Sequence, residues 1–286
     1  MNLSDYTYNG EKDFKLSKFN VDDTGNFKSK EDGLEKLDKN IHKMIELQDK
    51  LYAQNEYALL LVFQAMDTAG KDGAIKNVTS GLNPQGTQVY SFKQPSKEEL
   101  DHDYLWKYTK CLPERGRIGI FNRSYYEEVL VVKVHNLIDK QQIPRKMITK
   151  DIWKNRYEHI RCYEKYLYDN GIIPIKFFLH ISKDEQKKRL LERIEDKTKN
   201  WKFSDSDIAE RKYWNEYQDC FEDAIGETGT KYAPWYIVPS NHKWFSRVII
   251  SEAIVQTLER LDLKYPEVSK EQLDTLLKCK KILLEE

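Results

Sequence analysis

The chain has 286 residues, of which 40% are apolar and 33% are charged, and its 47 basic residues balance its 47 acidic ones. A chain of this length and composition forms one large α/β domain or two small ones, and a net charge of zero argues against bulk electrostatic attachment to nucleic acid or to an anionic membrane. The N-terminus lacks the apolar core of a signal peptide, the longest apolar run is too short to span a bilayer, and four widely spaced cysteines predict free thiols, so we expect a cytoplasmic protein.

The first part of the chain is predicted to hold an arm, a helix and then a series of strands. Residues 1–30 are polar and are expected to wrap the surface as an arm, whereas apolar residues recur at helical spacing over 31–54 and predict a helix. Several strand candidates are apolar almost throughout, as expected for strands that are covered on both faces. The five predicted strands span residues 57–66, 87–92, 117–122, 172–181 and 235–239.

Helical segments are predicted between and after these strands. Alternation of strand and helix indicates a parallel sheet with helices on both faces, in a three-layer α/β/α sandwich. Ligands of such sheets bind beyond the carboxyl ends of the strands, which brings together Asp67–Gly73, Asn122–Ser124 and the segment from Ser182 onward. Three helix starts match a capping box: Ser96 with Glu99, Ser182 with Glu185, and Ser269 with Gln272.

The loop after the first strand, "MDTAGKDG", has the features of a phosphate-binding turn. Gly70 and Gly73 let the backbone approach a ligand closely, and a helix that begins near Lys71 points free N–H groups at the loop. A lysine at a helix start is normally unfavourable, and a bound polyanion removes that conflict. Asp67 is placed to hold Mg²⁺ or to orient an attacking phosphate oxygen. The alternative is an ordinary tight turn with a solvated lysine and a capping aspartate.

The loop departs from the P-loop pattern at both ends. Ala65 stands where that pattern has its first glycine, and Asp72 stands where it has Ser or Thr. The missing hydroxyl usually ligates Mg²⁺, so a metal at this site would need carboxylates, with Asp67 as the first candidate.

The end of the third strand, "FNRSYYEE", offers a second group of polar side chains. Arg123 is suited to clamp phosphate in a bidentate fork, and Asn122 is able to ligate or to hydrogen-bond without adding charge. Glu127 lies one helical turn beyond Arg123. The alternative makes Asn122 a helix cap and Glu127 and Glu128 ordinary first-turn acids.

The charged segment after the fourth strand predicts a helical hairpin over the sheet edge. Two helices joined near residues 196–205 would stand where a lid closes over a ligand. The alternative is a surface hairpin stabilised by salt bridges. Trp201 and Trp214 are expected to be packing residues.

Five stretches in this order resemble polyphosphate kinases of the second type: "MDTAGKDG", "GLNPQGTQVYSFKQPS", "FNRSYYEEVLVVKVH", "DKTKNWKFSDSD" and "APWYIVPSNHKWFSR". The resemblance covers about residues 30–265. The third stretch looks most like the class III branch, which is associated with phosphorylating both nucleoside monophosphates and diphosphates, whereas other branches carry "FDRSWYNR" there.

The resemblance implies a single P-loop-kinase-like domain over 1–286, with an N-terminal arm and helix in about 1–54 and a lid in about 183–220. The implied reaction moves the terminal phosphoryl group of inorganic polyphosphate to AMP and ADP, with Mg²⁺ or Mn²⁺, in a homo-oligomer (dimer or tetramer) that binds neither nucleic acid nor membrane.

The resemblance also assigns residues. Catalysis is expected from Asp67, Lys71, Asn122 and Arg123. Because Asn122 replaces an acidic residue of the other branches, Glu127 is the substitute metal ligand beside Asp67. Phosphate is expected to bind Gly70, Lys71, Gly73, Lys76, Arg123, Arg189 and Arg193.

Two other functions remain open from the residues. One is an ATP-dependent nucleoside or nucleoside-monophosphate kinase, against which the broken P-loop weighs. The other is a non-catalytic polyphosphate- or nucleotide-binding protein, which only Asn122 favours. Metal-dependent turnover with short polyphosphate and ADP separates the three.

Overall fold

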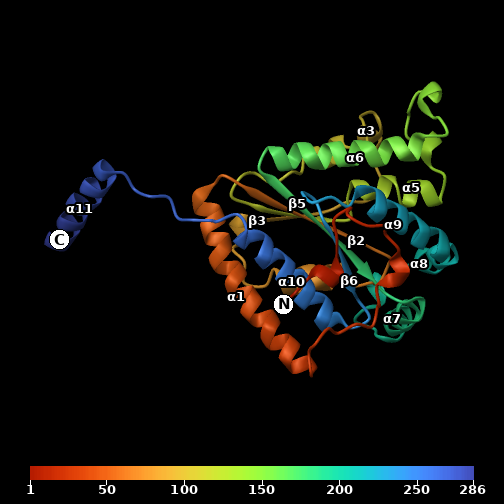
Figure 1. Cartoon of the computed structure of the whole chain (residues 1–286), viewed down its shortest axis with the longest axis horizontal. Helices are drawn as coiled ribbons and strands as arrows, with labels where there is room; N and C mark the ends of the chain where they lie inside the picture. The colour runs from red at the N-terminus through yellow and green to blue at the C-terminus, as the bar shows by residue number, and fades with distance from the viewer.

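A six-stranded sheet forms the centre of the molecule (Figure 1). The computed structural model describes residues 1–286, except for the side chain of Lys202. The strand order is β1-β6-β5-β2-β4-β3. The strands are β1 Thr7–Tyr8, β2 Ala58–Ala65, β3 Thr87–Ser91, β4 Ile118–Asn122, β5 Ile172–His180 and β6 Trp235–Pro239.

The five predicted strands are confirmed and pair with one another in parallel, but a sixth, short strand at one edge was not predicted. The two-residue strand β1 pairs antiparallel with β6, whereas the other neighbours pair in parallel. So short a strand has no readable alternation of side chains. The arm is also fastened to the body, because Leu3, Tyr6, Phe14 and Leu16 are buried.

Helices cover both faces of the sheet, which confirms the three layers (Figure 1). On one face α1 packs along α10, and α10 also contacts α2; on the other, α6 contacts β5 and α9. The predicted helix over 31–54 is confirmed as α1. The helices are α1 Lys30–Gln54, α2 Lys71–Val78, α3 Lys97–Leu100, α4 Trp106–Thr109, α5 Val131–Val134, α6 Ile152–Asp169, α7 Lys183–Glu195, α8 Asp205–Glu210, α9 Trp214–Thr228, α10 Lys243–Glu259 and α11 Lys270–Glu285.

Short 3-10 turns connect several of these elements. They span Ser4–Tyr6, Leu16–Lys18, Pro84–Gly86, Tyr125–Glu128, Ile138–Lys140, Arg145–Met147, Asn200–Lys202 and Arg211–Tyr213.

Two of the three predicted capping boxes form completely, at the starts of α3 and α11. At α7 only half of the box forms. The Ser182 hydroxyl accepts from the Glu185 amide, but the Ser182 amide donates to Asn241 instead. The Glu185 carboxylate accepts from Arg189 at 2.7 Å, so a tertiary contact has replaced the second bond of the box.

A buried ion pair holds the turn that follows β4. Lys176 on β5 donates to Glu164 on α6 at 2.6 Å, and both side chains are 0% exposed. The hydroxyls of Tyr125 and Tyr126 donate to the other Glu164 oxygen at 2.9 and 2.8 Å. The turn Tyr125–Glu128 is therefore anchored in the core.

Among the described residues, no helix is both long enough and apolar enough to cross a membrane. The four cysteines are free thiols in the same described structure, as predicted.

Candidate active site

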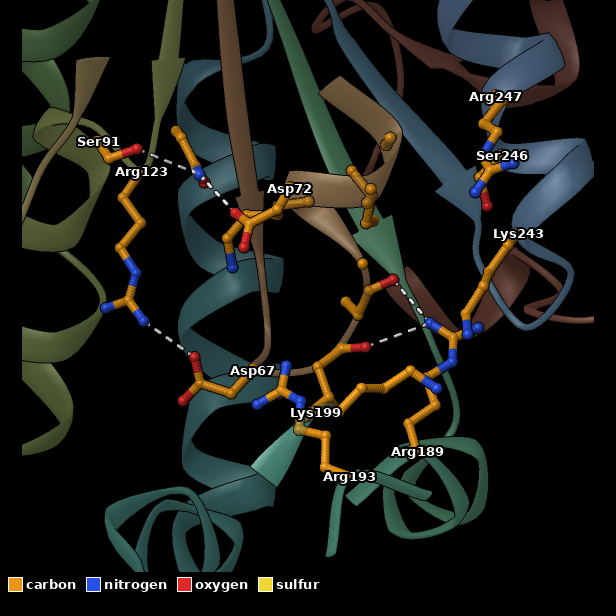
Figure 2. Close-up of a pocket in the computed structure, with 18 of the residues that line it drawn as sticks. Asp67, Asp72, Ser91, Arg123, Arg189, Arg193, Lys199, Lys243, Ser246 and Arg247 are labelled. Carbon is orange, nitrogen blue, oxygen red and sulfur yellow. Dashed lines mark hydrogen bonds and ion pairs between the residues drawn. The ribbon is translucent and has the colours of Figure 1, made fainter. Parts of the chain in front are cut away.

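A cavity of about 760 Å³ opens at the carboxyl ends of the parallel strands, where the sequence predicted a site (Figure 2). Its wall comes from the loop after β2, the ends of β3 and β4, helix α7 and the first turn of α10. Of the predicted site residues, those that line it are Asp67, Gly70, Lys71, Gly73, Asn122, Arg123, Arg189 and Arg193.

The loop after β2 turns sharply into α2. Gly70 caps the helix with a φ of +106°, and Thr68 also has a positive φ of 63°. A side chain at Gly70 would be strained at that φ, so glycine is required there. Lys71 begins the helix and donates from Nζ to the Ala65 carbonyl at 3.1 Å. Burial, followed by the nearby Arg123 charge, lowers the pKa of Lys71. A phosphate anion would relieve both effects.

Arg123 joins the end of β4 to the loop after β2. Its guanidinium donates to Asp67 at 2.9 Å and lies 3.8 Å from Glu127 (Figure 2). Burial opposes its charge, but the carboxylates of Glu127 and Asp67 outweigh burial and raise the pKa of Arg123. Its φ of +64° is unusual for a non-glycine residue. Such strain gathers at functional sites, and here it turns the side chain into the cavity.

Asn122 forms the second bridge between these two segments. Its Nδ2 donates to Asp72 at 2.7 Å and reaches Ser91 on β3 at 3.5 Å. Within the described structure its Oδ1 is buried and has no hydrogen-bond partner. An unsatisfied buried acceptor costs about 1–3 kcal/mol. It marks a place where a donor or a cation would bind favourably.

The prediction that Arg189 binds phosphate is not supported by its contacts. Its Nε donates to Glu185, and its four other N–H groups point at the carbonyls of Thr68, Ala69, Ser240 and Asn241. A guanidinium has five N–H donors, so all of them are used within the protein. Arg189 therefore fastens the loop after β2 to the end of β6.

The remaining predictions from the sequence are confirmed only in part. Arg193 lines the cavity and pairs with Asp207 on α8 at 3.0 Å. Among the described residues, Lys76 and Glu127 are the predicted site residues that do not line the cavity. Trp214 is buried as predicted, but the prediction for Trp201 is wrong, because its side chain is 78% exposed.

Several basic residues of the cavity were not predicted. Lys243 and Arg247 in the first turns of α10 lie across the cavity from Arg123 (Figure 2), and Lys93 and Lys199 also line the cavity. Burial and then the Arg189 charge lower the pKa of Lys243, and burial lowers that of Arg247. Basic residues four apart, just after a buried strand, were the available signal, because such a pair faces one side of a helix start.

The oxygen donors of the cavity fit a divalent cation that is shared with phosphate groups. Among the described residues, no group of three or more His, Cys, Asp and Glu side chains gathers to hold a metal ion. Mg²⁺ often takes only one or two protein carboxylates and obtains its other ligands from substrate phosphates and water. Asp67, Asp72 and the unpartnered Asn122 Oδ1 provide such donors.

Comparisons with known proteins show which proteins this chain resembles. The family model described as Polyphosphate kinase 2 matches residues 27–266. The ADP-polyphosphate phosphotransferase of Rhodopseudomonas palustris is 50% identical over 260 residues, which cover 90% of each chain. The AMP/ADP-polyphosphate phosphotransferase of Meiothermus ruber is 45% identical over 255 residues, which cover 89% of this chain and 92% of that protein. A crystal structure of polyphosphate kinase 2 from Arthrobacter aurescens TC1 superposes with a TM-score of 0.84 at 37% identity and covers 92% of each chain.

Proposed function

The chain belongs to the polyphosphate kinase 2 family, and from this premise we propose that it transfers the terminal phosphoryl group of inorganic polyphosphate to AMP and to ADP. The products are ADP and ATP, and the transfer is reversible in principle. This function is favoured over an ATP-dependent kinase and over a non-catalytic binding protein. The observation that carries the proposal is the charge of the cavity, where eight basic side chains face three acidic ones in a chain of zero net charge.

The cavity has two sides with different chemistry (Figure 2). On the α10 side, Lys243 and Arg247 line the cavity one helical turn apart, and two successive cations suit a long polyanion. On the β4 side, Arg123 is already paired with Asp67, and Asn122 with Asp72. We therefore assign the polyphosphate chain to the α10 side and the acceptor nucleotide to the β4 side.

The transfer needs alignment and charge neutralisation more than a strong base. The attacking phosphate oxygen of AMP or ADP is already ionised near neutral pH, and phosphoryl transfer depends mainly on positioning and electrostatic stabilisation. Lys71 and Arg123 approach the loop after β2 from two strand ends and would neutralise the transferred group. Removing one such preorganised charge costs about 10²–10³ in rate.

A divalent cation, Mg²⁺ or Mn²⁺, is proposed as the cofactor. Asp67 would hold it, with Asp72 or Asn122 as neighbouring donors, and the bound ion would supply further charge neutralisation on the phosphates. Glu127 contacts Arg123 rather than the cavity. Instead of holding the metal ion, Glu127 would orient Arg123 and act on the acceptor through that guanidinium.

A coupled assay tests the proposal, with polyphosphate as sole donor, Mg²⁺, and AMP, ADP, GMP or GDP as acceptor. We expect ADP from AMP and ATP from ADP. Conversion of ADP without any conversion of AMP would remove AMP from the acceptor range. Turnover with ATP as donor and none with polyphosphate would favour the nucleoside-monophosphate kinase instead.

The Glu127→Ala variant refines the same assay. If Glu127 orients Arg123 for the acceptor, the variant loses AMP use at least as strongly as ADP use, while its affinity for polyphosphate is unchanged. Wild-type rates with both acceptors would leave Glu127 as an ordinary acid of the turn.

A further inference from the structure

The C-terminal helix α11 stands apart from the rest of the molecule. Residues 264–269 lead away from the body as a segment without regular structure, and α11 projects beyond them (Figure 1). Every residue of α11 is exposed. The helix also lies beyond residues 27–266, which the family model matches. The contacts of the catalytic domain therefore give no reason for its presence.

The sequence of α11 nevertheless specifies a helix with one apolar face. It begins with the complete capping box of Ser269 and Gln272, so its start is fixed by local bonds. Leucines at spacings of three, four, ten and eleven residues share one side. This apolar stripe consists of Leu273, Leu276, Leu277, Leu283 and Leu284, each 47–77% exposed. Contiguous exposed apolar surface of this kind marks an interaction site.

One lysine and one charged flank restrict what can cover the stripe. Lys280 lies within the stripe, one turn beyond Leu276 and Leu277. One flank of the helix carries Lys270, Asp274, Lys281 and Glu285, whose signs read plus, minus, plus, minus, and Lys278 lies at the outer edge of that flank. This order is self-complementary when it is reversed, because Lys270 then meets Glu285 and Asp274 meets Lys281.

We propose that α11 is a self-association element and that it pairs antiparallel with α11 of a second copy of this chain. In an antiparallel pair the same flank of each helix faces its counterpart, so four opposite-charge pairs form about one centre between residues 277 and 278. The two copies of Leu277 meet there, and Leu273 of one copy meets Leu283 of the other.

A parallel pair would be less favourable for two reasons. It would place the two copies of Lys280 in the same layer of the seam, where like charges repel. The antiparallel register separates them by about five residues, or about 7.5 Å along the axis. A parallel pair would also place the charged flank against the opposite flank of its partner, which holds Gln272 and Cys279 and offers no opposite charge. A polar residue in such a seam commonly selects one pairing over another.

The size of the contact makes the association reversible. A helix of 16 residues is about 24 Å long, and a single pair of such helices buries less than the roughly 1,200 Å² of a stable interface. The pairing is therefore concentration-dependent, and it would add to any contact between the catalytic domains.

Sedimentation of the full chain over a concentration series tests the proposal first. Deletion of residues 270–286 is expected to raise the dissociation constant for self-association by more than tenfold, without changing the melting temperature or polyphosphate-dependent turnover per chain. A dissociation constant that the deletion leaves unchanged would overturn the proposal.

Charge reversal tests the direction of pairing. Asp274→Lys alone and Lys281→Asp alone each turn two attractive pairs into repulsive ones, and each should weaken association on the order of tenfold. The double variant restores both pairs and should return to within a few-fold of the wild-type dissociation constant. If the double variant is as weak as the single variants, the antiparallel pairing is wrong. Thr275→Lys, on the same helix but on the face away from this flank, is the control and should change association less than either single variant.

Discussion

Two ion pairs, one on each side of the turn after β4, show how this protein uses charge differently in its core and in its site. Lys176 and Glu164 are both 0% exposed, and Glu164 also accepts from two tyrosine hydroxyls. Arg123 and Asp67 are joined at a similar distance, 2.9 Å, but their side chains are 41% and 28% exposed and face the cavity. The core pair has its partners inside the protein, whereas the site pair has room for a ligand.

The difference follows from the environment of each pair. Taking two charges out of water costs several kcal/mol per ion, and only good geometry with further hydrogen bonds offsets this cost. The core pair has those bonds and fixes the turn. The site pair stays partly in water, where an exposed pair contributes little to stability. It holds Arg123 in place, and under the proposed function a phosphate would compete with Asp67 for this guanidinium.

The largest effect is expected from breaking the core pair. Lys176→Met leaves the Glu164 carboxylate buried without its cation, which should lower the free energy of unfolding by about 3–5 kcal/mol. Urea denaturation measures this directly. The double variant Lys176→Met with Glu164→Gln removes both charges and should recover part of the loss. A single variant as stable as wild type would mean that water reaches Glu164 in the native state.

The site pair should show the opposite behaviour. Asp67→Asn and Lys71→Met should each lower kcat/KM on the order of a hundredfold or more, because each removes a charge from the reacting region. Their melting temperatures should stay close to that of wild type. Lys76→Met is the matched control for Lys71→Met, since Lys76 lies on the same helix but does not line the cavity. Loss of activity only in proportion to loss of folded protein would contradict the contrast between the two pairs.

The sequence predicted the strands and the position of the site because both depend on local patterns. Apolar runs gave the five longer strands, and the glycine turn and strand ends placed Asp67, Lys71 and Arg123 at one edge. What it could not predict depends on contacts between distant segments. The bonds of Arg189 reach Thr68 and Ser240, which are more than 50 residues away in the chain, and only the fold shows that they use up its donors.

Arg189 holds backbone carbonyls in place, whereas Arg123 faces the cavity, and a substitution at Arg189 tests this difference. Arg189→Lys keeps a positive charge but loses the five-donor fork that holds four backbone carbonyls. We expect a loss of about 1–3 kcal/mol in unfolding free energy from the unpaired buried acceptors, together with slower transfer because the loop after β2 is loosened. If Arg189 acted on phosphate by its charge alone, the lysine variant would keep both stability and most of the activity.

The smallest effect is expected from removing a single cation on the α10 side. This effect distinguishes the α10 side of the cavity from the β4 side. Lys243→Ala or Arg247→Ala should raise the KM for polyphosphate several-fold and leave the KM for the nucleotide nearly unchanged, since each is one of several charges along a flexible polyanion. Salt gives a second readout, because each phosphate contact releases counterions. Removing one cation should reduce the slope of log KM against log salt concentration by about 0.7–0.9, as estimated from nucleic acids.

Asp72→Asn, on the β4 side, is the comparison variant and should change the nucleotide KM instead. If Lys243→Ala raised the nucleotide KM and left the salt slope for polyphosphate unchanged, the nucleotide would bind on the α10 side and polyphosphate on the β4 side.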